Sequence, residues 1–151
     1  MALFLTGEYR HQIDEKSRFR IPPKLRNSLG EEPLMTAGPD GCIALMPYLD
    51  GVEQINTAYG DIKINSSSAT PQHLKEARTV AANAYRASED NQSRIVLPPS
   101  LLKHAGIKKN IVTIGFLSRI EIWSQERWDA YIAGDTQVIE STQQIIEDTK
   151  K

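Results

Sequence analysis

The chain has 151 residues, of which 40% are hydrophobic and 25% are charged, and its formal net charge at pH 7 is −1. These totals indicate one ordinary domain, or two small halves fused into one, and they argue against a protein that coats nucleic acid by bulk charge. The single cysteine, Cys42, excludes an internal disulfide and a cysteine-rich zinc site, and no hydrophobic run approaches the roughly 18 residues that span a bilayer.

The first part of the chain predicts short strands separated by turns, with two helices among them. Alternating apolar and polar side chains indicate strands, Asp and Ser favour tight turns, and a proline pair ends a strand and can begin a helix. In chain order we expect a strand over 4–13, a turn over 14–17, a strand over 18–21, a helix over 23–29 that Gly30 stops, a strand over 33–37, a turn over 38–41, a strand over 42–46 and a helix over 47–59.

A serine-rich linker and a further helix are expected next. Thr70 is a candidate N-cap, and Pro71 would occupy the first helical position. Leu74, Ala77 and Val80 recur at helical spacing, so we expect this helix to pack one face inward.

The next part of the chain predicts the same order of elements again. Arg119 and Glu121 alternate with Ile120 and Ile122, which indicates a strand with one solvated face. We expect a strand over 84–89, a turn over 90–93, a strand over 94–97, a helix over 99–105, strands over 111–116 and 119–123, and a helix over 124–133 with Ser124 as its N-cap.

The two parts also match residue by residue. A shift of 76 positions aligns Asp14 with Asp90, Ser17 with Ser93, Arg18 with Arg94, Pro22 with Pro98 and Gly30 with Gly106; after one inserted residue a shift of 77 aligns Gly38 with Gly115 and Ile43 with Ile120. A match that keeps its order in this way indicates a duplicated unit whose two copies fold against each other. Within one compact domain we therefore distinguish copy one (1–55), a linker and connecting helix (56–83), copy two (84–134) and an acidic tail (135–151).

Charge is distributed unevenly along the chain. Residues 10–26 hold six basic and two acidic side chains, a net of +4, whereas residues 121–151 hold seven acidic and three basic ones, a net of −4. This pattern predicts a basic working face and an acidic tail that lies elsewhere.

The sequence offers little support for an enzyme. His11, His73 and His104 fall in different predicted elements without metal-ligand spacing, and no nucleophile or phosphate-loop motif is present. Asp14 and Asp90 would be a carboxylate pair, but their neighbours are turn residues and arginines, so a structural turn role is favoured. We expect no catalytic residue, no metal, no cofactor and no small-molecule substrate.

The repeated arginines are the better candidates for function. An exposed Arg on a rigid strand can contact a phosphate, or O6 and N7 of guanine in the major groove. Arg18 and Arg94, with Lys16 and Arg20 beside the first, would form a compact basic patch. The same Asp-x-x-x-Arg spacing is also compatible with a salt bridge that braces the turn, and the sequence leaves both readings open.

The doubled Asp-x-x-x-Arg motif, each copy followed by a strand and a proline, and the segment RIEIWSQERWDAY after the second copy together resemble the MraZ family. These are bacterial transcriptional regulators, similar at a distance to the AbrB and MazE swapped-hairpin DNA-binding proteins. The resemblance implies an α+β fold in which a pseudo-two-fold pair of β-α-β-type units shares a mixed sheet or barrel, with added helices.

The same resemblance implies a function and a set of residues. Such proteins form rings of eight or more subunits and bind short direct repeats in the promoter of their own division and cell-wall gene cluster, so the expected location is the cytoplasm, at the nucleoid. Arg18 and Arg94 would contact DNA together with Lys16, and Asp14, Asp90, Pro22 and Pro98 would brace the motifs. An alternative is an antitoxin-like protein-interaction module without a direct DNA role, which the acidic tail favours slightly.

One departure from the family pattern concerns the residue before each signature arginine. The family has Gly there, whereas this chain has Ser17 and Ser93. If the turn requires a positive φ, each serine costs on the order of 1 kcal/mol where glycine would not.

Overall fold

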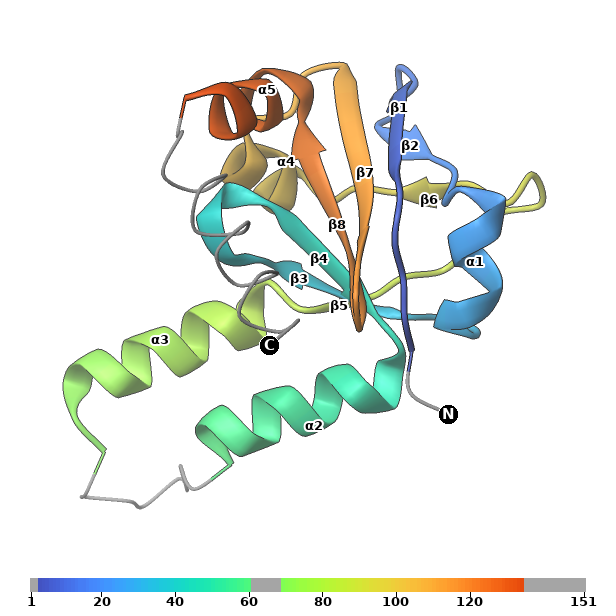
Figure 1. The fold of residues 1–151 in the computed structure, drawn as a ribbon. Coiled ribbons are helices and arrows are strands. Elements are labelled where there is room, and N and C mark those ends of the chain that lie inside the picture. Colours follow the sequence, from blue (N-terminus) through green and yellow to red (C-terminus); the bar gives the residue numbers. More distant parts are fainter. Residues whose placement is uncertain (1–2, 61–68, 135–151) are drawn as a thin grey trace, which may run out of the picture.

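The computed structural model describes residues 3–60 and 69–134, so the acidic tail 135–151 and part of the linker lie outside the described residues. The described residues form eight strands, five α-helices and one short 3-10 helix (Figure 1). In chain order these are β1 (Glu8–Gln12), β2 (Arg18–Phe19), α1 (Pro23–Leu29), β3 (Leu34–Ala37), η1 (Pro39–Gly41), β4 (Ile43–Met46), α2 (Tyr48–Tyr59), α3 (Pro71–Ala82), β5 (Tyr85–Arg86), β6 (Ile95–Val96), α4 (Pro99–Ala105), β7 (Asn110–Phe116), β8 (Arg119–Ser124) and α5 (Gln125–Ala133).

Six strands form one sheet in the order β1-β7-β8-β4-β3-β5, and β2 pairs with β6 in a separate two-stranded sheet. This confirms an α+β chain. The expected mixed sheet is wrong for the described residues, where every strand pairing is antiparallel. The physical reason is that β3–β4 and β7–β8 are hairpins with short connections, and antiparallel partners need no long crossover.

The strand order of the large sheet is symmetric between the two copies. If each strand is replaced by its equivalent in the other copy and the order is reversed, the same order results. Strand β1 of copy one pairs with β7 of copy two, β5 of copy two pairs with β3 of copy one, and β4 pairs with β8 at the centre. The central register is reciprocal as well, because Ile43 lies opposite Ile122 and Leu45 lies opposite Ile120. Each copy therefore completes its partner's half of the sheet, as the repeat predicts.

The large sheet is buried on both faces. On one face the side chains of Ile43, Leu45, Ile120 and Ile122 pack with residues of α1, α4, β2 and β6 in the main core. The other face carries two smaller apolar clusters, around Trp123 under α5 and around residues of β3 and β4 beside α2.

The prediction of one solvated face on β8 is therefore wrong. Helix α5 covers that face, and Glu121 is buried there with only 6% of its surface exposed. Its carboxylate accepts hydrogen bonds from Arg119 Nε at 2.9 Å and from Trp123 Nε1 at 3.2 Å. A strand with alternating charge can thus be buried on both faces when the charge is paired inside the strand.

The helix starts follow the sequence closely. Pro23 and Pro99 occupy the first positions of α1 and α4, and the Thr70 side chain accepts a hydrogen bond from the His73 amide at the start of α3. The inward face expected for α3 is present but only partly covered, because Leu74, Ala77 and Val80 are half-buried and no residue of α3 is fully buried. Figure 1 shows why: α2 and α3 lie side by side below the sheet, away from the main core.

Candidate functional site

The site is built on two turns with identical backbone hydrogen bonds. In copy one, the Ser17 amide donates to the Asp14 carbonyl at 3.0 Å and the Asp14 amide donates to the Arg18 carbonyl at 2.9 Å. In copy two the same two bonds join Ser93, Asp90 and Arg94 at 3.0 and 2.9 Å. We call residues 14–18 turn one and residues 90–94 turn two.

Each turn ends in a residue with left-handed backbone conformation. The φ angle of Ser17 is 58° and that of Ser93 is 60°. A four-residue turn whose last residue is left-handed has the geometry of the three-residue hairpin loop with a bulge, and that last loop position favours glycine. The positive φ considered from sequence is therefore present in both copies.

Each aspartate makes three hydrogen bonds within its own turn. Asp14 Oδ1 accepts hydrogen bonds from the amides of Lys16 and Arg18, both at 2.9 Å, and its Oδ2 accepts one from Arg18 Nε at 2.7 Å. Asp90 makes the same three contacts, with the amides of Gln92 and Arg94 and with Arg94 Nε, each at 2.9 Å. One carboxylate thus fixes both the turn backbone and the plane of the guanidinium that follows.

Turn one and turn two lie next to each other. Arg18 Nη1 lies 3.9 Å from Asp90 Oδ2, and Arg94 Nη1 lies 4.0 Å from Asp14 Oδ2. These distances are too long for hydrogen bonds but close enough for electrostatic attraction. Both arginine side chains are 23% exposed. The salt-bridge reading is therefore present in the structure, since each arginine bonds its turn aspartate through Nε, and the outer guanidinium edges remain near the surface.

The carboxyl groups respond to these contacts. For Asp14, desolvation raises the pKa, but hydrogen bonds from the Arg18 amide and side chain and from the Lys16 amide together lower it further, so the pKa lies below its usual value of 3.8. For Asp90, the hydrogen bond from the Arg94 amide is the main reason why the pKa lies below 3.8. Both carboxylates are therefore ionised at neutral pH, and the cluster of two aspartates and two arginines is electrically balanced.

Strands β2 and β6 hold the turns together. Arg18 lies opposite Val96 and Phe19 lies opposite Ile95, a register that is reciprocal between the copies. Phe19 and Ile95 are almost fully buried, which anchors the strands in the main core. Pro22 and Pro98 follow, and their carbonyl oxygens accept the first hydrogen bonds of α1 and α4.

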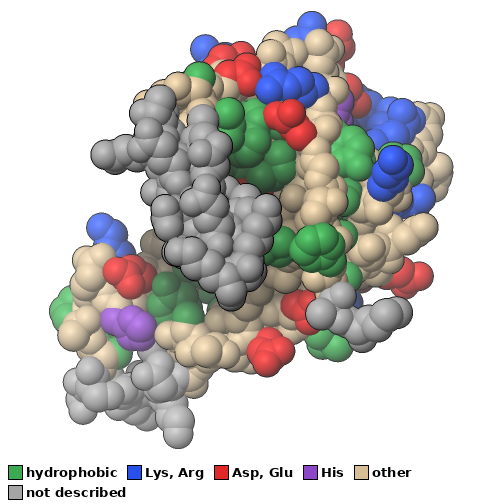
Figure 2. Space-filling model, viewed as in Figure 1, with side chains coloured by type: hydrophobic (Ala, Val, Ile, Leu, Met, Phe, Trp, Pro, Cys, Tyr) green, Lys and Arg blue, Asp and Glu red, His purple; other side chains and the backbone are tan. Residues whose placement is uncertain are grey.

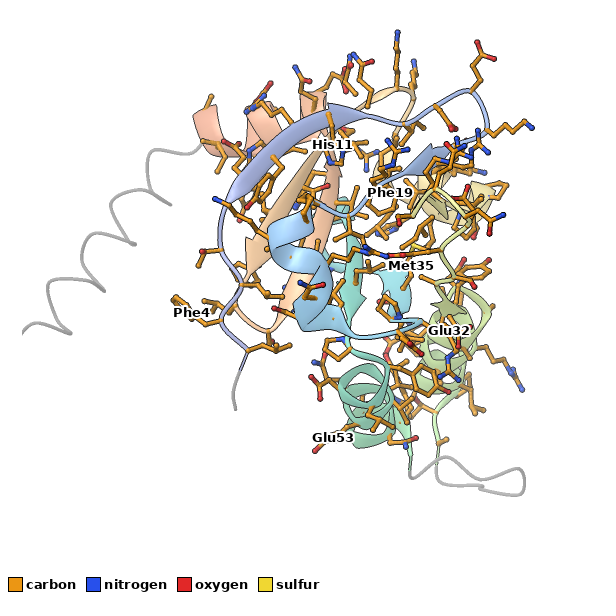
Figure 3. The ribbon with its side chains drawn as sticks, turned by 90° about the vertical axis from the view of Figure 1, so that its right-hand side faces the viewer. Phe4, His11, Phe19, Glu32, Met35 and Glu53 are labelled. Carbon is orange, nitrogen blue, oxygen red and sulfur yellow. The ribbon has the colours of Figure 1, made fainter. Side chains whose placement is uncertain are left out.

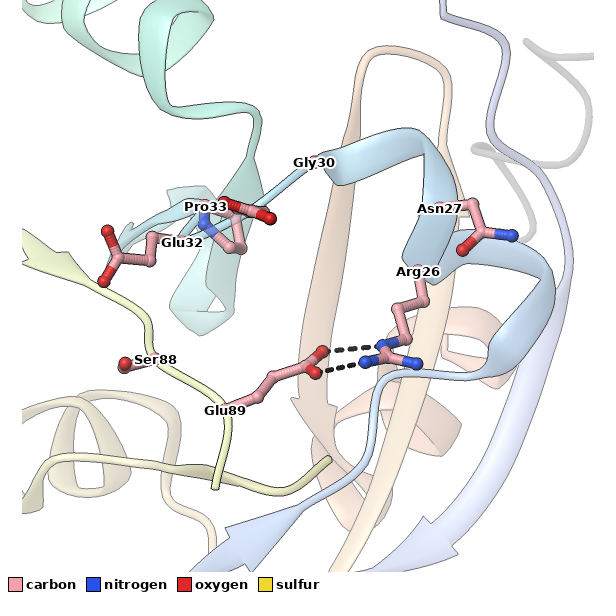
Figure 4. A pocket seen from close by; sticks show the side chains of 8 residues that line it. Arg26, Asn27, Gly30, Glu32, Pro33, Ser88 and Glu89 are labelled. Atoms are coloured by element: carbon pink, nitrogen blue, oxygen red, sulfur yellow. Dashed lines mark hydrogen bonds and ion pairs between the residues drawn. The ribbon is translucent and has the colours of Figure 1, made fainter. Parts of the chain in front are cut away.

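Two basic residues of copy one contact copy two instead of extending into solvent. Arg20 Nε donates to the Gln92 carbonyl at 2.9 Å. Arg26 Nε donates to Glu89 Oε1 at 2.8 Å, and the second guanidinium nitrogen reaches the other carboxylate oxygen (Figure 4). Arg20 and Arg26 therefore hold the segment around turn two, an interaction that the sequence analysis missed.

A signal for the Arg26 contact was present in the comparison of the copies. Arg20 and Arg26 align with Val96 and Leu102, so copy two lacks both, while copy one has Ile13 and Lys16 where copy two has Glu89 and Gln92. The unrepeated Arg26 thus occurs together with an unrepeated acceptor, the Glu89 carboxylate, whereas Arg20 bonds to the backbone carbonyl of Gln92, a group that every residue has. This coincidence is what a contact from one copy to the other produces.

A depression of about 500 Å³ opens beside the turns. It is lined by Arg18, Arg20 and Arg94 together with His11 and Asp14, among others. Figure 3 shows His11 and Phe19 next to each other there, and their rings are 6.2 Å apart. In Figure 2 several Lys and Arg side chains gather at the upper right, where Figure 1 places β2 and β6. Lys16 is exposed at the tip of turn one.

Other candidates for chemistry are not assembled into a site. His11, His73 and His104 lie on β1, α3 and α4, and within residues 3–60 and 69–134 no group of His, Cys, Asp and Glu could hold a metal ion. Cys42 is fully buried, and burial raises its thiol pKa to about 12, which makes it unreactive. No helix in the described part of the chain has the length and apolar character to cross a membrane.

The comparisons with known proteins converge on one family. The family model described as "MraZ protein, putative antitoxin-like" matches residues 4–48 and 80–148, which include both turns. The chain belongs to the MraZ family. A protein of Lachnoclostridium phytofermentans named transcriptional regulator MraZ is 41% identical over 131 residues, which cover 82% of this chain and 84% of that protein.

Two further relatives carry the same name. The protein of Clostridium botulinum strain Alaska E43 is 38% identical over 133 residues, covering 85% of this chain and 87% of its own length. The protein of Lactobacillus delbrueckii subsp. bulgaricus is 36% identical over 143 residues, covering 94% of each chain. The MraZ likeness therefore extends over nearly the whole sequence.

Proposed function

We propose that this protein is a transcriptional regulator that binds double-stranded DNA through turns one and two, and not an enzyme. The observation that carries the proposal is that the fold brings the two signature arginines to one surface, each fixed through Nε by an aspartate. A guanidinium held in this way keeps its outer nitrogens available for a phosphate or for the O6 and N7 atoms of guanine. The names of the MraZ relatives support the regulatory role.

The proposed contacts divide among four residues. Arg18 and Arg94 would contact DNA through their outer edges, and the exposed Lys16 would contact a phosphate from the tip of turn one. Arg20 would contribute its remaining guanidinium nitrogens, since Nε is bonded to Gln92. Asp14, Asp90, Pro22 and Pro98 would hold the turns in position.

We also propose that the protein acts as a ring-shaped homo-oligomer of AbrB-like swapped-hairpin units. The ring would bind direct repeats in the protein's own promoter, upstream of the division and cell-wall gene cluster, at the nucleoid in the cytoplasm. A ring presents many copies of a weak site to tandem repeats, so the effective concentration strengthens binding. Exposed apolar side chains support self-association: Phe4 and Leu49 are each 77% exposed and Leu117 is 50% exposed, and Figure 3 shows Phe4 extending away from the sheet.

The proposal is tested by fluorescence anisotropy with a labelled duplex from upstream of the protein's own gene and a shuffled duplex of equal length. We expect tighter binding to the upstream duplex. The logarithm of the binding constant should fall linearly with the logarithm of salt concentration, by roughly 0.9 per phosphate contacted. Equal affinity for both duplexes would refute sequence-specific regulation, and a flat salt response would refute the phosphate contacts.

A further inference from the structure

Turns one and two are held by different contacts from the other copy. Both have the same internal hydrogen bonds, but only turn two receives described contacts from the unrepeated arginines of the other copy, at Gln92 and at Glu89. Copy two has Val96 and Leu102 where copy one has these arginines, so equivalent side-chain contacts to turn one cannot form. Turn one is instead held through its backbone, because the Leu97 amide of copy two donates to the Ser17 carbonyl at 2.8 Å. Among the described residues, the contacts from arginine side chains of the other copy therefore fall on turn two, at Gln92 and Glu89.

The turns also differ in what they present at the tip. Equivalent positions carry Lys16 in turn one and Gln92 in turn two, and both side chains are exposed. The Gln92 backbone is fixed at both ends, because its amide donates to Asp90 Oδ1 and its carbonyl accepts from Arg20, each at 2.9 Å. Its side-chain amide has no hydrogen-bond partner among the described residues. The Gln92 side-chain amide, which is neutral and can both donate and accept hydrogen bonds, therefore projects from a rigid backbone.

These two residue types suit different contacts. A lysine is a compact charge on a flexible stem, and it serves well as a phosphate contact. A glutamine amide can donate to N7 and accept from N6 of adenine at once, which discriminates among bases but contributes no net charge. Phosphate contacts position the protein on the duplex, whereas base contacts determine sequence specificity. A rigid backbone is therefore more important for a residue that contacts a base.

We infer that Gln92 reads an adenine in the major groove, with Arg20 as a positioning residue for it, while Lys16 at the equivalent position of turn one contacts a phosphate. The inference rests on the proposed DNA-binding function and assigns the two turns different roles. The two halves of the duplicated unit therefore recognise DNA unequally. A site read in this way has a direction, as a direct repeat does, whereas two identical halves would require a palindrome.

The test is a binding assay in which each base pair of the upstream duplex is replaced in turn. For Gln92→Ala we expect the preference for one A·T pair, about 5- to 150-fold in the unaltered protein, to disappear, with the salt slope unchanged. For Lys16→Ala we expect weaker binding to all duplexes and a salt slope smaller by about one. Gln54→Ala, an exposed glutamine on α2, should change neither quantity.

A third variant separates positioning from direct contact by Arg20. Arg20→Val places in copy one the residue that copy two has, and we expect it to lower the preference at the same A·T pair as Gln92→Ala. If Arg20→Val weakens binding to every duplex equally, Arg20 does not position Gln92. If Gln92→Ala binds with an unchanged preference at every pair, the inference is wrong and the proposed function stands. If the unaltered protein does not bind the duplex, the proposed function itself fails.

Discussion

Ser17 and Ser93 each place a side chain in the left-handed backbone region, at φ angles of 58° and 60°. Such a conformation costs a non-glycine residue on the order of 1 kcal/mol. Because the same bulged turn occurs twice, the strain occurs twice, immediately before the arginines of the site. The turns retain their shape because the aspartate bonds and the buried pair Phe19 and Ile95 fix both ends.

We therefore predict that Ser17→Gly and Ser93→Gly stabilise the protein. Glycine relieves the strain but raises the entropy of the unfolded chain, so the net gain should be about 0.5 kcal/mol per site. The free energy of unfolding from urea titration measures this gain. Ser28→Gly, in helix α1, is the matched control, and there we expect a loss of up to about 1 kcal/mol. Destabilisation by the turn variants as large as that of the control would contradict the account.

At the residue scale the sequence predicted local contacts better than distant ones. The Asp-x-x-x-Arg spacing suggests an ion pair between Asp14 and Arg18, and that pair is present at 2.7 Å. The bond from Arg20 to Gln92 joins residues 72 positions apart, and no local spacing predicts it. The comparison of the two copies shows that Arg20 is not repeated, but it does not identify Gln92 as the partner, because the acceptor is a backbone carbonyl.

Turns one and two behave as one structural element, because their four charged side chains face each other. Arg18 lies within 4 Å of Asp14 and Asp90, and Arg94 likewise lies near both. The contacts lower the pKa values of both aspartates below 3.8 in the folded state. A carboxyl group with a lowered folded-state pKa contributes stability above its unfolded pKa, and this contribution is lost as pH falls through the folded pKa.

We predict that the double variant Asp14→Asn, Asp90→Asn is less stable than the unaltered protein at pH 7, and that the difference shrinks as the pH falls below 3.8. Urea midpoints at a series of pH values measure the difference. Asp129 also has a lowered pKa, through its bond with Arg10, so the comparison between variants and not the absolute stability is informative. Glu53→Gln on α2 (Figure 3) is the control for removing a carboxylate elsewhere. A difference that is independent of pH would count against the paired-turn cluster.

At the element scale, helix boundaries and most strands were predictable from local sequence patterns, but the burial of these elements was not. The helices expected over 23–29 and 99–105 form over those residues. The apolar spacing of α3 identifies its half-buried side at Leu74, Ala77 and Val80, but it does not say how completely that side is covered, and no residue of α3 is fully buried. The alternation of charged and apolar residues in β8 predicts a solvated face. That prediction fails because helix α5 packs against the strand, and a local pattern contains no information about such tertiary packing.

At the scale of the whole molecule, duplication followed by divergence explains the arrangement of the site. The strand order and the central register are reciprocal between the copies, so both signature motifs arrive at one surface. The repeat predicted that the two copies fold against each other, but it did not predict which strands pair. The excess of basic residues in copy one was also predictable from sequence. The expectation that Arg20 and Arg26 simply add to a basic patch was incomplete, because both side chains contact copy two.

The most direct measurement is the affinity of the double variant Arg18→Ala, Arg94→Ala for the upstream duplex at constant salt. Loss of two fixed guanidinium contacts should weaken binding at least about 30-fold. Light scattering should give the same particle mass as for the unaltered protein, because β2, β6 and the core do not depend on these side chains. An affinity within about twofold of the original, at unchanged mass, would contradict DNA binding through the paired turns.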